Sequence, residues 1–117
     1  MAFELTTREL DRIIVVDAVG RLTLNDSRTQ LRDLIHIFTG NGHKNFLLNL
    51  AGVEVIDSDG MGELVRSYSV VRQQGGEMKL VRLSERVQHL LQITRVNTIF
   101  EIYGDELMAL QAFRKRA

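Results

Sequence analysis

Two aspartates enclose a serine at Asp57, Ser58 and Asp59, directly after an apolar run. Oxygen-bearing side chains at such a boundary are typical of a helix N-terminus, where unpaired N–H groups carry partial positive charge. From spacing alone, the favoured interpretation is that Asp57 or Ser58 simply caps a helix. The functional alternative is that Ser58 is presented for modification, because N–H groups at a helix start also accommodate a phosphate.

A phosphate on Ser58 would add about −1.5 to −2 charges at neutral pH. Beside Asp57 and Asp59, it would create a strongly negative surface without a change of fold. Gly60 and Gly62 fit this interpretation, because small residues let a partner approach the backbone closely.

Other chemistries find little support in the sequence. No G-x-x-x-x-G-K-[ST] phosphate loop occurs, and Ser58 does not lie in a G-x-S-x-G motif. Asp57 and Asp59 would sit on an open helix start, without an apolar pocket to separate their pKa values. The histidines show no metal-binding spacing; they are His36, His43 and His89. We therefore expect a protein that is not an enzyme and has no catalytic residue, cofactor or metal.

Length and charge limit the possible partners. The 117 residues fit one domain, residues 1–117, and 15 acidic side chains balance 15 basic ones. No long-range field would then draw the chain to nucleic acid or anionic lipid. There is no cysteine, and the start "MAFELTTREL" has no long apolar run, so a cytoplasmic protein without membrane contact is expected. The only basic run, residues 114–116, suits a solvated helix end.

The first third of the sequence predicts a hairpin and a helix. The strands are residues 3–9 and 12–19, rich in β-branched residues, and the polar "LDR" between them suits a turn. Gly20 is expected to end the second strand. A helix is expected to start at Asn25 or Asp26, with an apolar stripe formed by Leu31, Leu34, Ile35 and Phe38.

The remaining sequence alternates between strands and helices. The expected strands are residues 45–50, which look buried, then 77–81 and 99–103. Three helices are expected, the first ended by Gly75 and Gly76, the second capped by Ser84 and the third by Asp105. Their apolar stripes are Met61, Leu64, Val65, Tyr68 and Val71 or Arg72; then Val87, Leu90 and Leu91; then Leu107, Leu110 and Phe113. The order β-β-α-β-α-β-α-β-α predicts an α/β fold: a mixed, mostly parallel sheet of about five strands flanked by about four helices.

These residues resemble the STAS domain of anti-sigma factor antagonists over nearly the whole chain. The family pattern is an apolar strand, then D-S-[ST]-G-[LM]-G, then a helix, then a glycine pair near a strand. The corresponding segments are residues 45–50, 57–62 and 75–77, and Gly20-Arg21-Leu22 matches the family's G-x-L.

The resemblance implies a STAS-like fold and a partner switch. In the family, the serine at the position of Ser58 is phosphorylated by an anti-sigma factor that is itself an ATP-dependent kinase. The unphosphorylated antagonist binds the anti-sigma factor and frees the sigma factor, and the phosphorylated form lets go. A monomer is expected, and a serine phosphatase is a further candidate partner. The implied partner-binding residues are Asp57, Ser58, Asp59, Gly60, Met61 and Gly62.

Two departures from the family keep alternatives open. Asp59 stands where the family has a second hydroxyl, and Thr23 stands where it has the aspartate of G-x-L-D. The chain gains one carboxylate at Asp59 and lacks one at Thr23, so the net charge near Ser58 can stay nearly the same as in the family. Because Asp59 departs from the family pattern beside the switch serine, one alternative is a non-switching STAS scaffold or adaptor of a stress-signalling or transport complex. Another is a small-molecule binder, for example of nucleotides, which only the anion site at the helix start supports.

Overall fold

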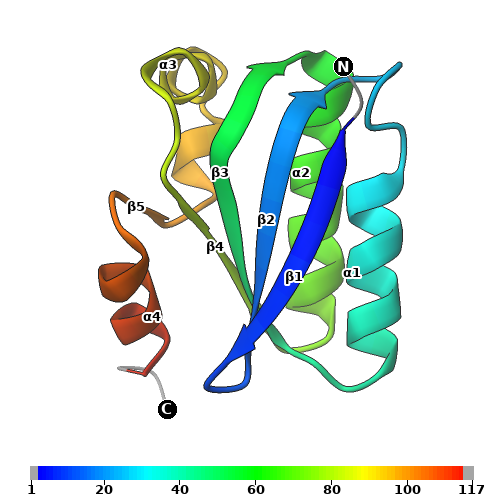
Figure 1. Cartoon of the computed structure of the whole chain (residues 1–117), viewed down its shortest axis with the longest axis vertical. Coiled ribbons are helices and arrows are strands. Elements are labelled where there is room, and N and C mark those ends of the chain that lie inside the picture. Colours follow the sequence, from blue (N-terminus) through cyan, green and yellow to red (C-terminus); the bar gives the residue numbers. More distant parts are fainter. Residues whose placement is uncertain (1–2, 115–117) are drawn as a thin grey trace.

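The computed structural model describes residues 3–114. Within this range the chain forms a five-stranded sheet, four α-helices and one short 3₁₀-helix (Figure 1). In chain order, the elements are β1 Glu4–Leu10, β2 Ile13–Leu22, α1 Gln30–Gly40, β3 Asn45–Ile56, α2 Ser58–Gln73, β4 Glu77–Val81, α3 Glu85–Ile93, η1 Val96–Thr98, β5 Ile102–Tyr103 and α4 Glu106–Arg114.

The strands lie in the order β1-β2-β3-β4-β5, which is also their order in the chain. β1 pairs antiparallel with β2, whereas β2, β3, β4 and β5 run parallel. This arrangement confirms the predicted mixed, mostly parallel sheet. Parallel neighbours need crossover helices, and their carboxyl ends share one edge of the sheet. The β3–α2 junction, where Ser58 lies, is therefore at that edge.

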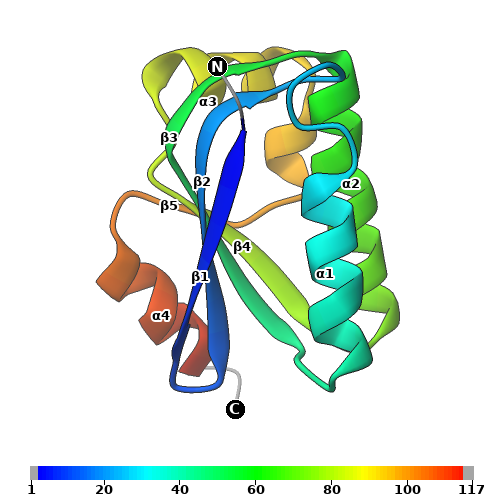
Figure 2. The same ribbon diagram turned by 45° about the vertical axis from the view of Figure 1, so that its right-hand side comes forward.

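The two faces of the sheet are covered by different helices. α1 and α2 pack side by side against one face, and α4 lies against the other (Figures 1 and 2). The larger apolar core lies under α1, α2 and α3, and includes Phe46, Leu48 and Leu64. A smaller cluster under α4 contains Val15 and Leu47. β2 and β3 supply buried residues to both clusters, as expected for central strands.

The segment between β2 and α1 differs from the sequence prediction. β2 does not end at Gly20 but continues to Leu22, and Gly20 adopts a φ of 115° beside a shift in the β2–β3 register. A glycine inside a strand commonly marks such an irregularity. The helix begins at Gln30 rather than at Asn25 or Asp26. The backbone carbonyl of Thr23 accepts hydrogen bonds from the Ser27 and Arg28 N–H groups, so residues 23–28 form turns.

The C-terminal third also departs from the prediction. The expected strand 99–103 shrinks to Ile102–Tyr103. Ile99 instead ends the short helix η1, Val96–Thr98, since its N–H donates to the Val96 carbonyl at 3.0 Å. In α4 the buried residues are Ala109 and Phe113, whereas Leu107 is 66% exposed. In α2 the alternative between Val71 and Arg72 resolves to a buried Val71. Lys115 and Arg116 of the basic run lie outside the described residues.

An ion-pair network ties α4 to the sheet. Arg8 on β1 donates to Asp17 on β2 at 2.8 Å and to Glu106 on α4 at 2.7 Å. Asn49 on β3 donates to the same aspartate at 2.8 Å. The hydrogen bonds from Arg8 are the main cause that lowers the pKa of Asp17 below its ordinary value. This face of the molecule is therefore held together by contacts distant from the β3–α2 junction.

Candidate functional site: the β3–α2 junction

Asp57 caps α2 and ties it to the neighbouring loop. One carboxylate oxygen accepts a hydrogen bond from the Gly60 N–H at 2.7 Å, and the other accepts from the Leu24 N–H at 3.1 Å. Its backbone is extended, as is typical of an N-cap residue. Of the two caps that the sequence allowed, Asp57 is therefore the one used. The Ser58 hydroxyl is not needed to start the helix.

The six residues expected to bind a partner, residues 57–62, differ in their exposure to solvent. Ser58 and Asp59 are exposed, Asp57 and Gly62 are half-buried, and Gly60 and Met61 are buried. A Cβ added to Gly60 would lie 1.8 Å from the Leu22 carbonyl oxygen. The space beside Gly60 is thus filled by this chain's own backbone rather than left open for a partner. Ser58 and Asp59 present the accessible polar side chains of the motif.

The loop after β2 supplies a further carboxylate to this end of the molecule. Thr23 is buried, and its hydroxyl donates to Asp26 at 2.7 Å. Asp26 also lies 3.5 Å from the guanidinium of Arg21. The loop is attached to the helix start by the bond from Leu24 to Asp57. Asp26 is therefore the acidic residue that this loop carries, while Thr23 takes the buried position.

Glu63 is a buried carboxylate that the sequence reading did not single out. It is 3% exposed, and it accepts a hydrogen bond from the Arg32 N–H in the first turn of α1 at 3.3 Å. The N-cap residue of α1, Thr29, makes no capping hydrogen bond with its side chain. The carboxylate of Glu63 on α2 instead accepts an N–H group at the start of α1. The guanidinium groups of Arg32 and Arg66 lie 3.9 and 3.4 Å from Glu63. The spacing of Glu63 and Arg66 signals an i,i+3 pair, but the contact with α1 spans 31 residues.

Exposed aliphatic side chains are carried by the segments on either side of the α2 start. Leu24, in the loop bonded to Asp57, is 57% exposed, and Ile93, at the end of α3, is 64% exposed. Thr94 follows Ile93, and its hydroxyl, which donates to the Leu90 carbonyl at 2.8 Å, lies 3.1 Å from the Met61 sulfur. Both side chains are therefore available to a partner that approaches the start of α2.

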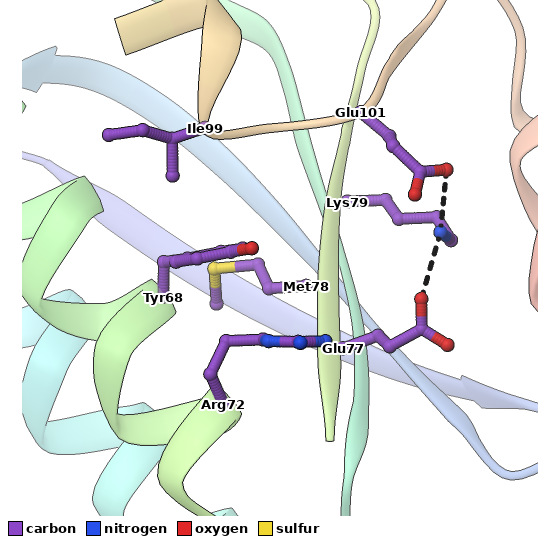
Figure 3. Close-up of a pocket in the computed structure, with 7 residues that line it drawn as sticks. All are labelled: Tyr68, Arg72, Glu77, Met78, Lys79, Ile99 and Glu101. Atoms are coloured by element: carbon purple, nitrogen blue, oxygen red, sulfur yellow. Dashed lines mark hydrogen bonds and ion pairs between the residues drawn. The ribbon is translucent and has the colours of Figure 1, made fainter. Parts of the chain in front are cut away.

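A separate polar cavity of about 150 Å³ lies beside the first residues of β4 (Figure 3). It is lined by Tyr68, Arg72, Glu77, Met78, Lys79, Ile99 and Glu101. The Lys79 side chain is 2% exposed, and its ammonium lies 3.2 Å from Glu77 and 2.8 Å from Glu101. The ammonium also lies 5.0 Å from the centroid of the Phe113 ring. Lys79 is therefore held in place by contacts within the chain, and it joins β4 to α4.

Removal of the Asp57 cap should destabilise the protein. Asp57→Ala deletes both hydrogen bonds of the carboxylate, so the free energy of unfolding is expected to fall by about 1–2 kcal/mol. Asp59→Ala is the matched control, because Asp59 is exposed and its charge acts only through the helix dipole, so its loss should cost about 0.5 kcal/mol. Urea unfolding followed by circular dichroism measures both. Equal effects of the two substitutions would contradict the assignment of the cap.

Comparison with known proteins places the chain in a family. The family model described as the STAS domain matches residues 4–108. A Thermotoga neapolitana protein, named a candidate anti-sigma factor antagonist homolog, is 37% identical over 79 residues, covering 68% of this chain and 70% of its own. The anti-sigma-B factor antagonist of Bacillus subtilis is 42% identical over 53 residues, covering 45% of this chain and 49% of its own.

A solved structure supports the same assignment at the level of the fold. The anti-sigma factor antagonist of Mycobacterium paratuberculosis superposes with a TM-score of 0.85 at 19% identity, covering 97% of this chain and 95% of its own. Among residues 3–114, the helices are too short or too polar to cross a lipid bilayer. The family match, the five-stranded mixed sheet and the capped helix start agree, and the chain belongs to the STAS domain family.

Proposed function

We propose that the chain is an anti-sigma factor antagonist whose binding to an anti-sigma factor is controlled by phosphorylation of Ser58. The unphosphorylated protein binds the anti-sigma factor through the start of α2 and thereby frees a sigma factor. The anti-sigma factor is itself the serine kinase. The bond from Ser58 Oγ to the γ-phosphorus of ATP forms as the bond to the ADP oxygen breaks, and the hydroxyl proton passes to a base of the kinase. The chain acts as a substrate and binding module, not as an enzyme.

The observation that supports this proposal is the separation of capping from the candidate switch. Asp57 makes the capping hydrogen bonds, at 2.7 and 3.1 Å, and the adjacent Ser58 is exposed. A hydroxyl with no part in the fold can gain a phosphate without unfolding the helix. The negative charge would then act on the binding surface rather than on the stability of the protein.

The proposed contact surface combines polar and apolar elements. The N-terminal turn of α2 provides Ser58 and Asp59, and the flanking segments provide the exposed side chains of Leu24 and Ile93. Apolar anchors around a switchable polar centre allow tight binding that is lost when charge is introduced there. Gly60 contributes to this surface by setting the position of the helix against Leu22.

Phosphorylation is tested with the purified chain, ATP and the anti-sigma factor kinase encoded in the same genome. Intact-mass measurement should show the gain of one phosphate, and Ser58→Ala should abolish that gain. Ser69→Ala serves as the control, because Ser69 is another exposed serine of α2. A phosphate gain that survives Ser58→Ala, or no gain in the unaltered chain, would refute the switch.

A non-switching scaffold is the second candidate, and Asp59 is the observation that favours it. This exposed carboxylate makes the helix start negative before any phosphorylation. For a scaffold, light scattering should detect a large assembly, and Ser58→Ala should leave partner binding and its regulation unchanged. The antagonist proposal expects regulation to be lost in that variant.

A further inference from the structure

The guanidinium of Arg66 lies over Gly62, one helical turn closer to Ser58 than its own backbone. A Cβ built on Gly62 would lie 3.1 Å from one terminal nitrogen of Arg66 and 3.2 Å from the other. Helical side chains lean toward the N-terminus of their helix, and the missing side chain at Gly62 leaves the surface free for this arginine. Half of the Arg66 side chain, 52%, remains exposed to solvent.

Ser58, Gly62 and Arg66 follow one another at intervals of four along α2. Side chains at i and i+4 are neighbours on a helix, with Cβ atoms about 5–6 Å apart. The Arg66 guanidinium already lies where a side chain of residue 62 would be. It is therefore separated from Ser58 by one i to i+4 spacing along the helix. A phosphoryl group on Ser58 would extend from the serine oxygen, and rotation of the arginine side chain can close the remaining gap.

The present partner of Arg66 can release it. Arg66 contacts Glu63 at 3.4 Å, which is long for a charge-assisted hydrogen bond. Glu63 also accepts the Arg32 N–H at 3.3 Å and lies 3.9 Å from the Arg32 guanidinium. Its carboxylate therefore keeps a hydrogen bond and a positive neighbour when Arg66 turns away.

We propose that Arg66 binds the phosphoryl group of phosphorylated Ser58 within the same chain, an inference that rests on the proposed phosphorylation of Ser58. Arginine suits this role because its planar guanidinium can donate two parallel hydrogen bonds to phosphate oxygens. The contact also explains how a phosphate can be accommodated next to Asp59, which stands where the family has a hydroxyl. A permanent carboxylate beside the phosphate is repulsive, and the cation drawn along Gly62 offsets that repulsion.

The test uses protein with phosphoserine installed at position 58 during translation, so no kinase is involved. Phosphorus-31 NMR then follows the second ionisation of the phosphoserine as pH is varied. A bound guanidinium favours the dianion, so the midpoint in the parent should lie about 0.5–1 pH unit below that of Arg66→Gln. The carboxylates of the helix start, Asp57 and Asp59, and of the loop bonded to it, Asp26, are the same in both proteins, so their opposing effect cancels.

Arg72→Gln is the matched control, since Arg72 is an exposed arginine of the same helix more than three turns from Ser58. It should leave the midpoint at the parent value. Gly62→Ala supplies an independent perturbation, because the added methyl group would displace the guanidinium; the midpoint should move toward that of Arg66→Gln. Equal midpoints in the parent and in Arg66→Gln would overturn the proposal. That outcome is distinct from a kinase that ignores Ser58, which would refute the proposed switch but leave this measurement intact.

Discussion

Gly60→Ala is expected to lower the free energy of unfolding by about 3 kcal/mol or more. The added Cβ would lie 1.8 Å from the Leu22 carbonyl oxygen and 2.7 Å from its carbon. These are backbone atoms of a buried residue, and the same carbonyl accepts a hydrogen bond from the Asp57 N–H at 3.3 Å. Neither partner can move aside without disturbing the junction between β2 and the start of α2.

Gly62→Ala provides the matched control, two residues along the same helix. Its Cβ would meet only the end of the Arg66 side chain, at 3.1 Å, which is flexible and can move. Alanine is favoured over glycine in a helix by about 1 kcal/mol, so this variant should be as stable as the parent or slightly more stable. Urea unfolding of both variants measures the difference. A Gly60→Ala protein within about 1 kcal/mol of the parent would contradict the close packing of Gly60 against Leu22.

The order of strands and helices could be predicted because local sequence patterns indicate each element. Segments rich in β-branched residues marked β1 and β2, and apolar residues at i, i+3, i+4 and i+7 from Leu31 to Phe38 marked α1. The start of α1 could not be predicted, because Asn25 and Asp26 are good caps in isolation. In the folded chain, the Thr23 carbonyl and hydroxyl close residues 23–28 into turns, which delays the helix to Gln30.

Within the site, the sequence predicted the residue types but not their spatial roles. The motif predicted a capped helix with an exposed serine, and the structure has Asp57 as the cap and Ser58 at the surface. The close packing of Gly60 against Leu22 and the contact of Glu63 with Arg32 join residues more than 30 positions apart. No local pattern encodes such pairs. They depend on how the elements pack, which only the folded chain reveals.

Ser58→Glu is expected to weaken binding to the anti-sigma factor by about 100-fold or more, whereas Ser58→Ala should bind like the parent. A carboxylate at the centre of an interface must lose its water, and here it would also lie beside Asp59. Alanine removes the hydroxyl without adding charge, and the hydroxyl is not needed for the cap. Calorimetric titration of each variant with the anti-sigma factor from the same genome measures the affinities.

Ser69→Glu separates an effect at the interface from a general effect of charge on α2. Ser69 is exposed on the same helix but eleven residues, or about three turns, after Ser58. The same substitution there should change the affinity less than about threefold, because exposed charges outside an interface act weakly and are screened by salt. If Ser58→Glu and Ser69→Glu weaken binding equally, charge on α2 acts at long range and the start of the helix is not the contact. A large loss confined to Ser58→Glu places the binding surface at the β3–α2 junction, where one phosphate would be enough to release the partner.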